Sequence, residues 1–221
     1  MYFFIAVLIF MVMNFFPDSV SWTIHQRFDL KDESNLPAWF SSMLLLLVSI
    51  GSLTLHFLQD KTAKTSRFWL FMSGVYLYLS ADEGAMLHEA LSPHVKWFYV
   101  YAPLSGLFFL YVVRHCLRYE STQIRNRIIG GMLLFAGGSL FFEVLWYYNR
   151  PVSDQAYHIL AVFQEGCEMI GSITVLSGVL MRLNMQFNGE VTASSGQSHE
   201  RLDAYRGTLL GRLLLWMLGV R

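Results

Sequence analysis

Long apolar segments alternate with short polar ones along the chain, and this pattern predicts a bundle of transmembrane helices. The hydrocarbon core of a bilayer is about 30 Å thick, so a helix needs about 20 apolar residues to cross it. The first segment is the shortest, but it has neither the basic start nor the small-residue cleavage site of a signal peptide. We therefore predict six membrane helices, over residues 1–16, 38–58, 68–90, 97–117, 128–148 and 157–183.

The end of the chain has a different pattern. Residues 184–207 are polar and rich in Ser, Gly and Gln, which is typical of a flexible tail. Residues 208–220 are apolar but too short to span, and they include Arg212, which favours an amphipathic helix lying on the membrane surface. We therefore predict an all-α six-helix transmembrane domain over residues 1–183 and a cytoplasmic tail with a surface helix over residues 184–221.

Basic residues predict the orientation of the bundle. Most of the 16 Lys and Arg residues follow the second, fourth and sixth predicted helices. Because cytoplasmic loops carry the excess of Lys and Arg, both termini are expected in the cytoplasm of a cell whose plasma or inner membrane holds the protein. Trp and Tyr residues gather at the opposite boundaries, as in an interfacial belt.

Composition agrees with a membrane protein, because 54% of the residues are hydrophobic and only 14% are charged. The formal net charge is zero, so nothing indicates a nucleic-acid partner. The lipid bilayer is the expected partner, and the pattern says nothing about protein partners. Cys116 and Cys167 fall at different predicted depths, which argues against a disulfide and favours packing roles.

Six acidic residues interrupt the apolar pattern, and no Lys or Arg is predicted at their depth. Burying a carboxylate in hydrocarbon costs several kcal/mol, so such residues face a bundle interior or water and are functional candidates. Counting along the helices at 1.5 Å per residue places those of the third, fifth and sixth helices in one outer layer. Two histidines are expected on the same side. The acids are Asp82, Glu83, Glu89, Glu143, Glu165 and Glu168, and the histidines are His88 and His158.

The helical period indicates which of these residues share a face. At about 100° per residue, His158, Glu165, Glu168 and Ser172 fall within a sector of about 80° on the sixth helix. On the third helix Asp82 and Glu89 align, whereas Glu83 and His88 point to either side. Gly84 offers a place where that helix loosens.

Carboxylates and imidazoles from several helices are the usual ligands of divalent metals in helical bundles. A bound dication would also offset the buried negative charge. We therefore list Asp82, Glu83, His88, Glu89, Glu143, His158, Glu165 and Glu168 as candidate ligands of a divalent metal ion, iron or zinc, which supports membrane-embedded chemistry. The diagnostic Glu-x-x-His spacing is missing, and the sixth helix carries Glu165-x-x-Glu168 instead.

Two alternatives stay open, and the sequence leaves undecided whether the protein is an enzyme. The first is a proton- or cation-coupled transporter, since buried acids exchange protons readily and Pro103 and Gly137–Gly138 offer helix breaks. Against transport, the chain shows no internal repeat, and the inner half has almost no acids. The second alternative is a structural or interaction protein, in which the polar residues only join helices.

Four strings resemble an uncharacterised family of prokaryotic multi-pass membrane proteins. They are YLSADEGAMLHE at residues 78–89, QEGCEMIG at 164–171, FDL at 28–30 and NLPAWFSS at 35–42. The resemblance implies a shared site built on the LSxDE(x4)HE and EExxEMxG patterns, and it implies no activity. Gln164 stands where the second pattern often has an acid, which puts a ligand role at this position in doubt.

Overall fold

The computed structural model describes residues 2–15, 27–30, 35–60, 63–88, 96–148, 153–187 and 189, without the side chains of Asp154, Gln155 and His158. These residues form helices and no strand, which confirms the all-α prediction. The elements are α1 (Tyr2–Phe15), α3 (Leu36–Leu58), α4 (Lys64–Ala85), α5 (Trp97–Tyr119), α6 (Thr122–Ala136), the π-helical turn η3 (Gly137–Phe141), α7 (Phe142–Tyr148) and α8 (Asp154–Phe187).

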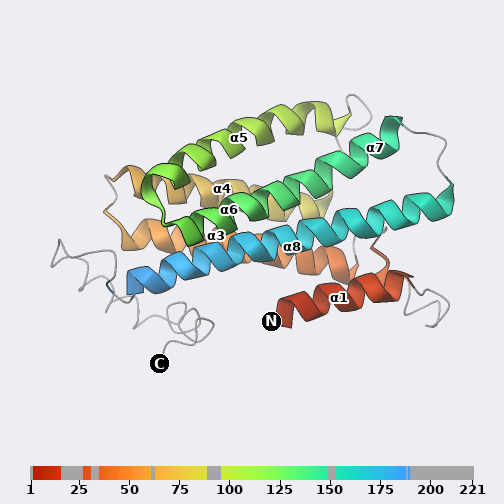
Figure 1. Cartoon of the computed structure of the whole chain (residues 1–221), viewed down its shortest axis with the longest axis horizontal. Helices are drawn as coiled ribbons and strands as arrows, with labels where there is room; N and C mark the ends of the chain where they lie inside the picture. The colour runs from red at the N-terminus through yellow and green to blue at the C-terminus, as the bar shows by residue number, and fades with distance from the viewer. Residues whose placement is uncertain are drawn as a thin grey trace.

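The helices lie alongside one another, and α8 runs the whole length of the bundle (Figure 1). Successive helices reverse direction, with α6, η3 and α7 acting as one continuous helix. At one end of the bundle α4 and α7 finish and α3, α5 and α8 begin. We call this the site end and the other the far end.

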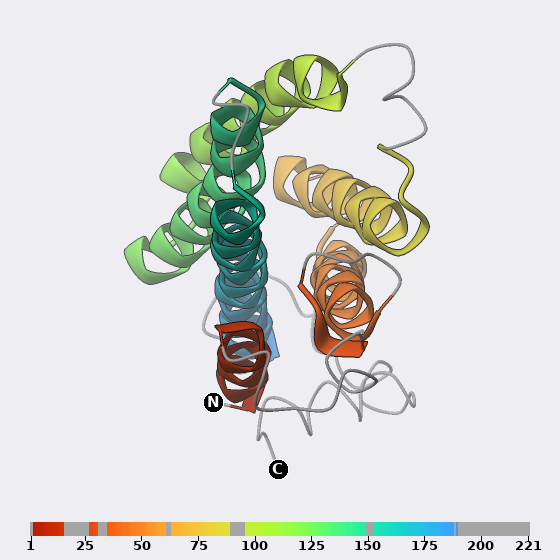
Figure 2. The same cartoon turned by 90° about the vertical axis from the view of Figure 1, so that its right-hand side faces the viewer.

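Two close helix pairs form the centre of the bundle: α3 with α4, and α6 with α8. Helix α3 also packs against α8, whereas α5 lies at the edge (Figure 2). Small polar residues join α3 to α4, because the Ser49 hydroxyl donates to the Ser73 carbonyl at 2.9 Å and Ser42 donates to the Ser80 carbonyl at 2.8 Å. The apolar core beside them is fully buried and includes Leu44, Val48, Leu55, Phe68, Trp69 and Met72.

Glycines allow α6 and α8 to approach closely. A Cβ atom on Gly131 would lie 2.7 Å from the Gly171 carbonyl oxygen, and one on Gly171 would lie 2.6 Å from the Phe135 nitrogen. Such backbone-to-backbone contact is a common way to join membrane helices. The adjacent Gly130 has no atom within 4 Å of its Cβ position, so only one face of α6 makes this contact.

Four helical stretches are long and apolar enough to cross a membrane: Leu36–Leu58, Trp97–Tyr119, Thr122–Tyr148 and Ile159–Phe187. The other two predicted spans are helices too, but α1 has 14 residues, and α4 has 22 residues with four charged side chains, so neither meets both criteria. Four of the six predicted segments therefore form helices that are long and apolar enough to cross a membrane.

Three predicted details change in the structure. Helix α4 ends at Ala85 instead of residue 90, because Met86 adopts the left-handed conformation with φ 53°. Helix α8 continues four residues beyond the predicted end at 183; there Phe187 is buried and Gln186 bonds to Arg182 within the helix. Pro103 lies inside α5 without ending it. The predicted surface helix at 208–220 lies outside the described residues.

Two further sequence expectations hold. Cys116 and Cys167 are both free thiols. The Gly137–Gly138 pair does deform its helix, since the π-helical turn η3 starts there.

Candidate functional site

A cavity of about 420 Å³ opens between α3, α4, α5, α7 and α8 at the site end. Six of the eight candidate site residues line it: Asp82, Glu83, His88, Glu143, Glu165 and Glu168. Glu89 and the side chain of His158 lie outside the described residues. Segments that are far apart in the sequence therefore bring five carboxylates and one imidazole to the same space, which we call the acidic pocket.

The turn after α4 is organised by Asp82. This residue is only 8% exposed, and its Oδ1 accepts the backbone N–H of His88 at 2.7 Å. The His88 ring also approaches Asp82, with 3.3 Å between Nδ1 and Oδ2. These contacts stabilise the reversal at Met86, so His88 folds back to the pocket instead of continuing the helix. The predicted alignment of Asp82 with Glu89 on one helical face is therefore wrong, because α4 has ended before residue 89.

Tyrosines extend this network on one side of the pocket. The Tyr101 hydroxyl donates to Asp82 Oδ1 at 3.3 Å and also pairs with the Tyr78 hydroxyl. The Trp97 ring lies 5.4 Å from the His88 ring and 5.7 Å from the Tyr101 ring, both centroid to centroid. Asp82 is thus held by neighbours from α5 and from its own turn.

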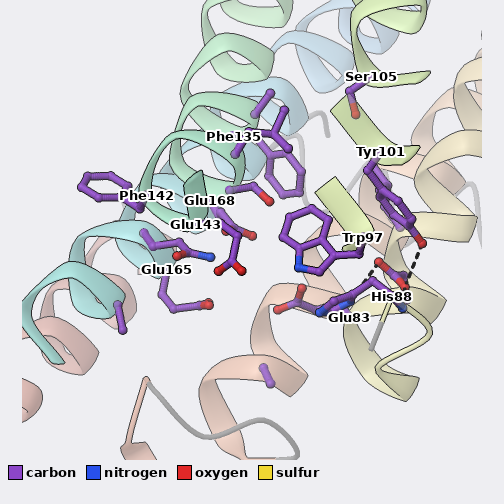
Figure 3. Close-up of a pocket in the computed structure, with 18 of the residues that line it drawn as sticks. Glu83, His88, Trp97, Tyr101, Ser105, Phe135, Phe142, Glu143, Glu165 and Glu168 are labelled. Carbon is purple, nitrogen blue, oxygen red and sulfur yellow. Dashed lines mark hydrogen bonds and ion pairs between the residues drawn. The ribbon is translucent and has the colours of Figure 1, made fainter. Parts of the chain in front are cut away.

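Three glutamates form the opposite wall. Glu143 lies in the first turn of α7, and Glu165 and Glu168 lie about one turn apart on α8. Figure 3 shows these three side chains gathered together, with Trp97 between them and the Glu83–His88 side. Glu168 is 6% exposed, and Gly138 of η3 packs beside it, since a Cβ there would lie 3.4 Å from Glu168 Cγ. The glycine in the π-helical turn thus allows the two parts of the wall to come together.

The predicted polar stripe on α8 divides in two. Glu165 and Glu168 face the pocket, but Ser172 is not among the lining residues; it is 1% exposed, and its hydroxyl has no hydrogen-bond partner in the part of the chain that the structure describes. The stripe therefore continues into the helix contact rather than into the cavity.

Helix α5 contributes lining residues that the charge pattern did not reveal. Trp97, Tyr101, Ser105 and Phe108 line the pocket at intervals of three or four residues. This spacing marks one face of a helix, so the mixed aromatic and polar stripe was readable in the sequence. Gln164, whose role the family pattern put in doubt, also lines the pocket.

One lining residue changes the electrostatic picture. Lys96, which precedes α5, lines the pocket and places its Nζ 5.7 Å from the centre of the Tyr147 ring. The sequence pattern predicted no basic residue at the depth of the acids. Within the described part of the chain, the folded structure sets one ammonium group against five carboxylates.

The lining residues fit a metal ion poorly. Within the described ranges, no three His, Cys, Asp or Glu side chains lie close enough to hold one. The acids share a cavity without converging on a single point. The metal ligands listed above therefore stay a prediction.

Glu120 at the far end behaves differently. Its side chain is 2% exposed, and the Arg182 Nε lies 3.1 Å from Oε2 and 3.3 Å from Oε1. Arg182 also donates to Gln186 at 3.2 Å. This acid is thus buried against a guanidinium, and it is not among the residues that line the acidic pocket.

Comparison with known proteins gives a family but no activity. A family model described as a domain of unknown function, DUF8692, matches residues 1–183. The chain belongs to this family. No curated protein and no solved structure matches it.

Proposed function

We propose that this DUF8692 protein binds a positively charged ligand, larger than a bare metal ion, in the acidic pocket. The observation that carries the proposal is the lining: among the described residues, five carboxylates from α4, α7 and α8 and a single Lys surround one cavity. Such a surface attracts cations and repels anions. Intramembrane acids that face a cavity are typical of functional sites.

The size and the walls of the pocket favour a polyatomic cation. A cavity of about 420 Å³ lies in the range of small-molecule sites, and a dehydrated metal ion would leave most of it empty. Trp97 adds an aromatic ring between the two acidic sides, and Tyr101 adds one beside Asp82. Rings of this kind attract ammonium groups by about 0.5–2 kcal/mol each, depending on desolvation. An organic amine therefore suits this lining better than iron or zinc does.

The packing beneath the pocket favours binding over transport. Leu44, Val48, Leu55 and Met72 are fully buried in the described bundle. A transported cation would have to displace this apolar core to reach the far end. We propose a site that opens to one side only, and the distribution of Lys and Arg supports the non-cytoplasmic side of a plasma or inner membrane, with both termini in the cytoplasm.

The proposal is tested by thermal unfolding of the purified protein with butylamine, tetramethylammonium, Mn²⁺, Zn²⁺ and Fe²⁺ as probes. A ligand at 100 times its Kd adds about 2.7 kcal/mol to the free energy of unfolding. We expect the amines to raise the Tm of the wild type, and Glu165→Gln to weaken this shift about tenfold or more in ligand concentration. Asp60→Asn, an exposed acid at the far end, is the matched control and should leave the shift unchanged.

Two results would contradict the proposal. If no cation shifts the Tm of the wild type, the pocket is not a cation site. If a metal ion raises the Tm and the amines do not, and if the metal stays bound in stoichiometric amount after dialysis, the site binds a metal ion instead of an organic cation. Ion-dependent flux in proteoliposomes that disappears in Glu165→Gln would instead support the transport alternative.

A further inference from the structure

An apolar groove on the outside of the bundle lies next to the acidic pocket and shares one lining residue with it. The groove lies between α4 and α5 and is lined by Phe71, Leu104, Leu107, Phe108 and Tyr111. Phe108 lines both spaces, with its ring 6.4 Å from Tyr76 on the pocket side and 5.7 Å from Phe71 on the groove side. A single aromatic side chain therefore separates a charged cavity from an apolar surface.

The groove faces the region that lipid would occupy. Helix α5 is one of the four membrane-spanning candidates, and Leu104 and Leu107 are 60% and 66% exposed. Helices α4 and α5 touch at few positions, which leaves room between them. Ten residues of α5 separate Tyr101 in the pocket from Tyr111 in the groove, a rise of about 15 Å, or about half of the hydrocarbon core. The two spaces together match the depth of one leaflet.

The order of the two spaces matches the orientation of an amphiphile in a membrane. Along α5 the pocket is lined from Lys96 to Phe109 and the groove from Leu104 to Tyr111, so the groove begins further from the site end. A head group in the pocket would leave its chain pointing into the bilayer. The head group must carry a net positive charge, because a phosphate beside five carboxylates would be repelled.

We infer that the ligand is a membrane-resident amphiphile with a cationic amine head and a single long apolar chain. The head lies among the acids of the pocket, and the chain lies in the groove between α4 and α5. The inference rests on the proposed function, since it assigns the pocket's cation to the lipid phase instead of the aqueous phase. Phe108, between the two spaces, marks the point where the head joins the chain.

The test compares a long-chain amine, hexadecylamine, with the short butylamine. Both are titrated in the same detergent against the full chain, and retained ligand is counted by native mass spectrometry. Leu107→Trp should fill the groove, and Leu110→Trp is its matched control, because Leu110 is 64% exposed on the same helix but does not line the groove. Leu104→Trp serves as a second groove variant should Leu107→Trp fold poorly.

We expect Leu107→Trp to weaken hexadecylamine binding about tenfold or more, because the indole ring would occupy the space of the chain and overpacking typically costs about 1–3 kcal/mol. Butylamine binding should stay unchanged in both tryptophan variants, and Leu110→Trp should bind hexadecylamine like the wild type. Equal affinity for the two amines, or equal effects of Leu107→Trp and Leu110→Trp, would overturn the inference while leaving the proposed function intact. If the wild type binds neither amine, both this inference and the proposed function are wrong.

Discussion

The two ends of the bundle use acidic residues in opposite ways. At the far end Glu120 is buried against Arg182 at 3.1 Å, and the pair joins the end of α5 to α8. At the site end five carboxylates line a cavity that is open to a ligand. A carboxylate that pairs with a guanidinium therefore stabilises the fold. Carboxylates that line a cavity instead provide a surface for a ligand.

The helices also pack more closely in the centre of the bundle than they do around α5. The α3–α4 and α6–α8 pairs are joined by serines and glycines at close range, whereas α5 lies at the edge with many exposed apolar side chains. The close pairs provide the rigid frame of the protein. The pocket is lined on one side by the loosely packed α5. Substitutions in the close helix pairs should therefore change mainly stability, and substitutions in the pocket should change mainly binding.

The largest effect is expected from Arg182→Met at the far end. Removing one partner of a buried ion pair typically costs about 3–5 kcal/mol, because the other charge stays buried without compensation. Thermal or denaturant unfolding of the purified protein measures this loss. Arg118→Met, which removes an exposed charge near the same end, should change stability by less than about 0.5 kcal/mol.

The pH dependence of this variant sharpens the comparison. Burial raises the pKa of the Glu120 carboxyl, and the Arg182 guanidinium opposes that rise. Without the guanidinium the folded-state pKa rises further, so the folded protein binds the proton more tightly than the unfolded chain does. Arg182→Met should therefore regain stability as the pH falls below the folded-state pKa of Glu120, and lose it as the pH rises through that value. A loss of stability that is equal at all pH values would contradict this account.

An intermediate effect is expected at the glycine contact between α6 and α8. Gly131→Ala places a Cβ 2.7 Å from backbone atoms of α8 and should cost about 1–3 kcal/mol, because the helices must move apart. The neighbouring Gly130→Ala meets no atom within 4 Å and should stabilise the helix by about 0.5–1 kcal/mol. Equal changes in the two midpoints of unfolding would show that the close approach of α6 to α8 does not contribute to stability.

The smallest effect on stability is expected at the site end. Tyr101→Phe removes one donor to Asp82 and the contact with Tyr78, at a cost of about 1 kcal/mol. Tyr119→Phe, an exposed tyrosine at the other end of α5, is the control. The difference between the regions should appear in the binding of butylamine, which Tyr101→Phe weakens and Tyr119→Phe does not. Should Tyr101→Phe destabilise the fold as much as Arg182→Met, the two ends would not differ in the way described here.

Much of the fold was predictable because membrane helices satisfy their own backbone hydrogen bonds. A long run of apolar residues in the sequence is therefore enough to identify such a helix. The helices formed by the predicted segments differ from them by a few residues, mostly at the ends, and the shared layer of Asp82, Glu143 and Glu165 followed from counting along helices of known rise. The polar contributors from α5 were harder to recognise. In the sequence Trp97 and Tyr101 resemble aromatic residues of a membrane interface. Only the folded structure shows that Tyr101 donates to Asp82 and that the Trp97 ring packs near His88.

The ends of helices were the least predictable part of the site. Nothing in the run from Asp82 to His88 requires a reversal at Met86, a residue that rarely adopts positive φ. The side chain of Asp82 accepts the N–H of His88 across the reversal, and Tyr101 of α5 donates to the same oxygen, so the turn is stabilised in part by a contact with another helix.

The sequence by itself determined the helices, the separation of acids from apolar segments and the common depth of the acids, because these depend on local hydrogen bonding and on hydrophobic length. Only the tertiary structure decided which acid packs against a guanidinium and which acids line a cavity. Glu120 and Arg182 are 62 positions apart, and Lys96 reaches the pocket from a segment that reads as a loop. Such contacts depend on how helices pack in space, and the order of residues along one helix does not contain that information.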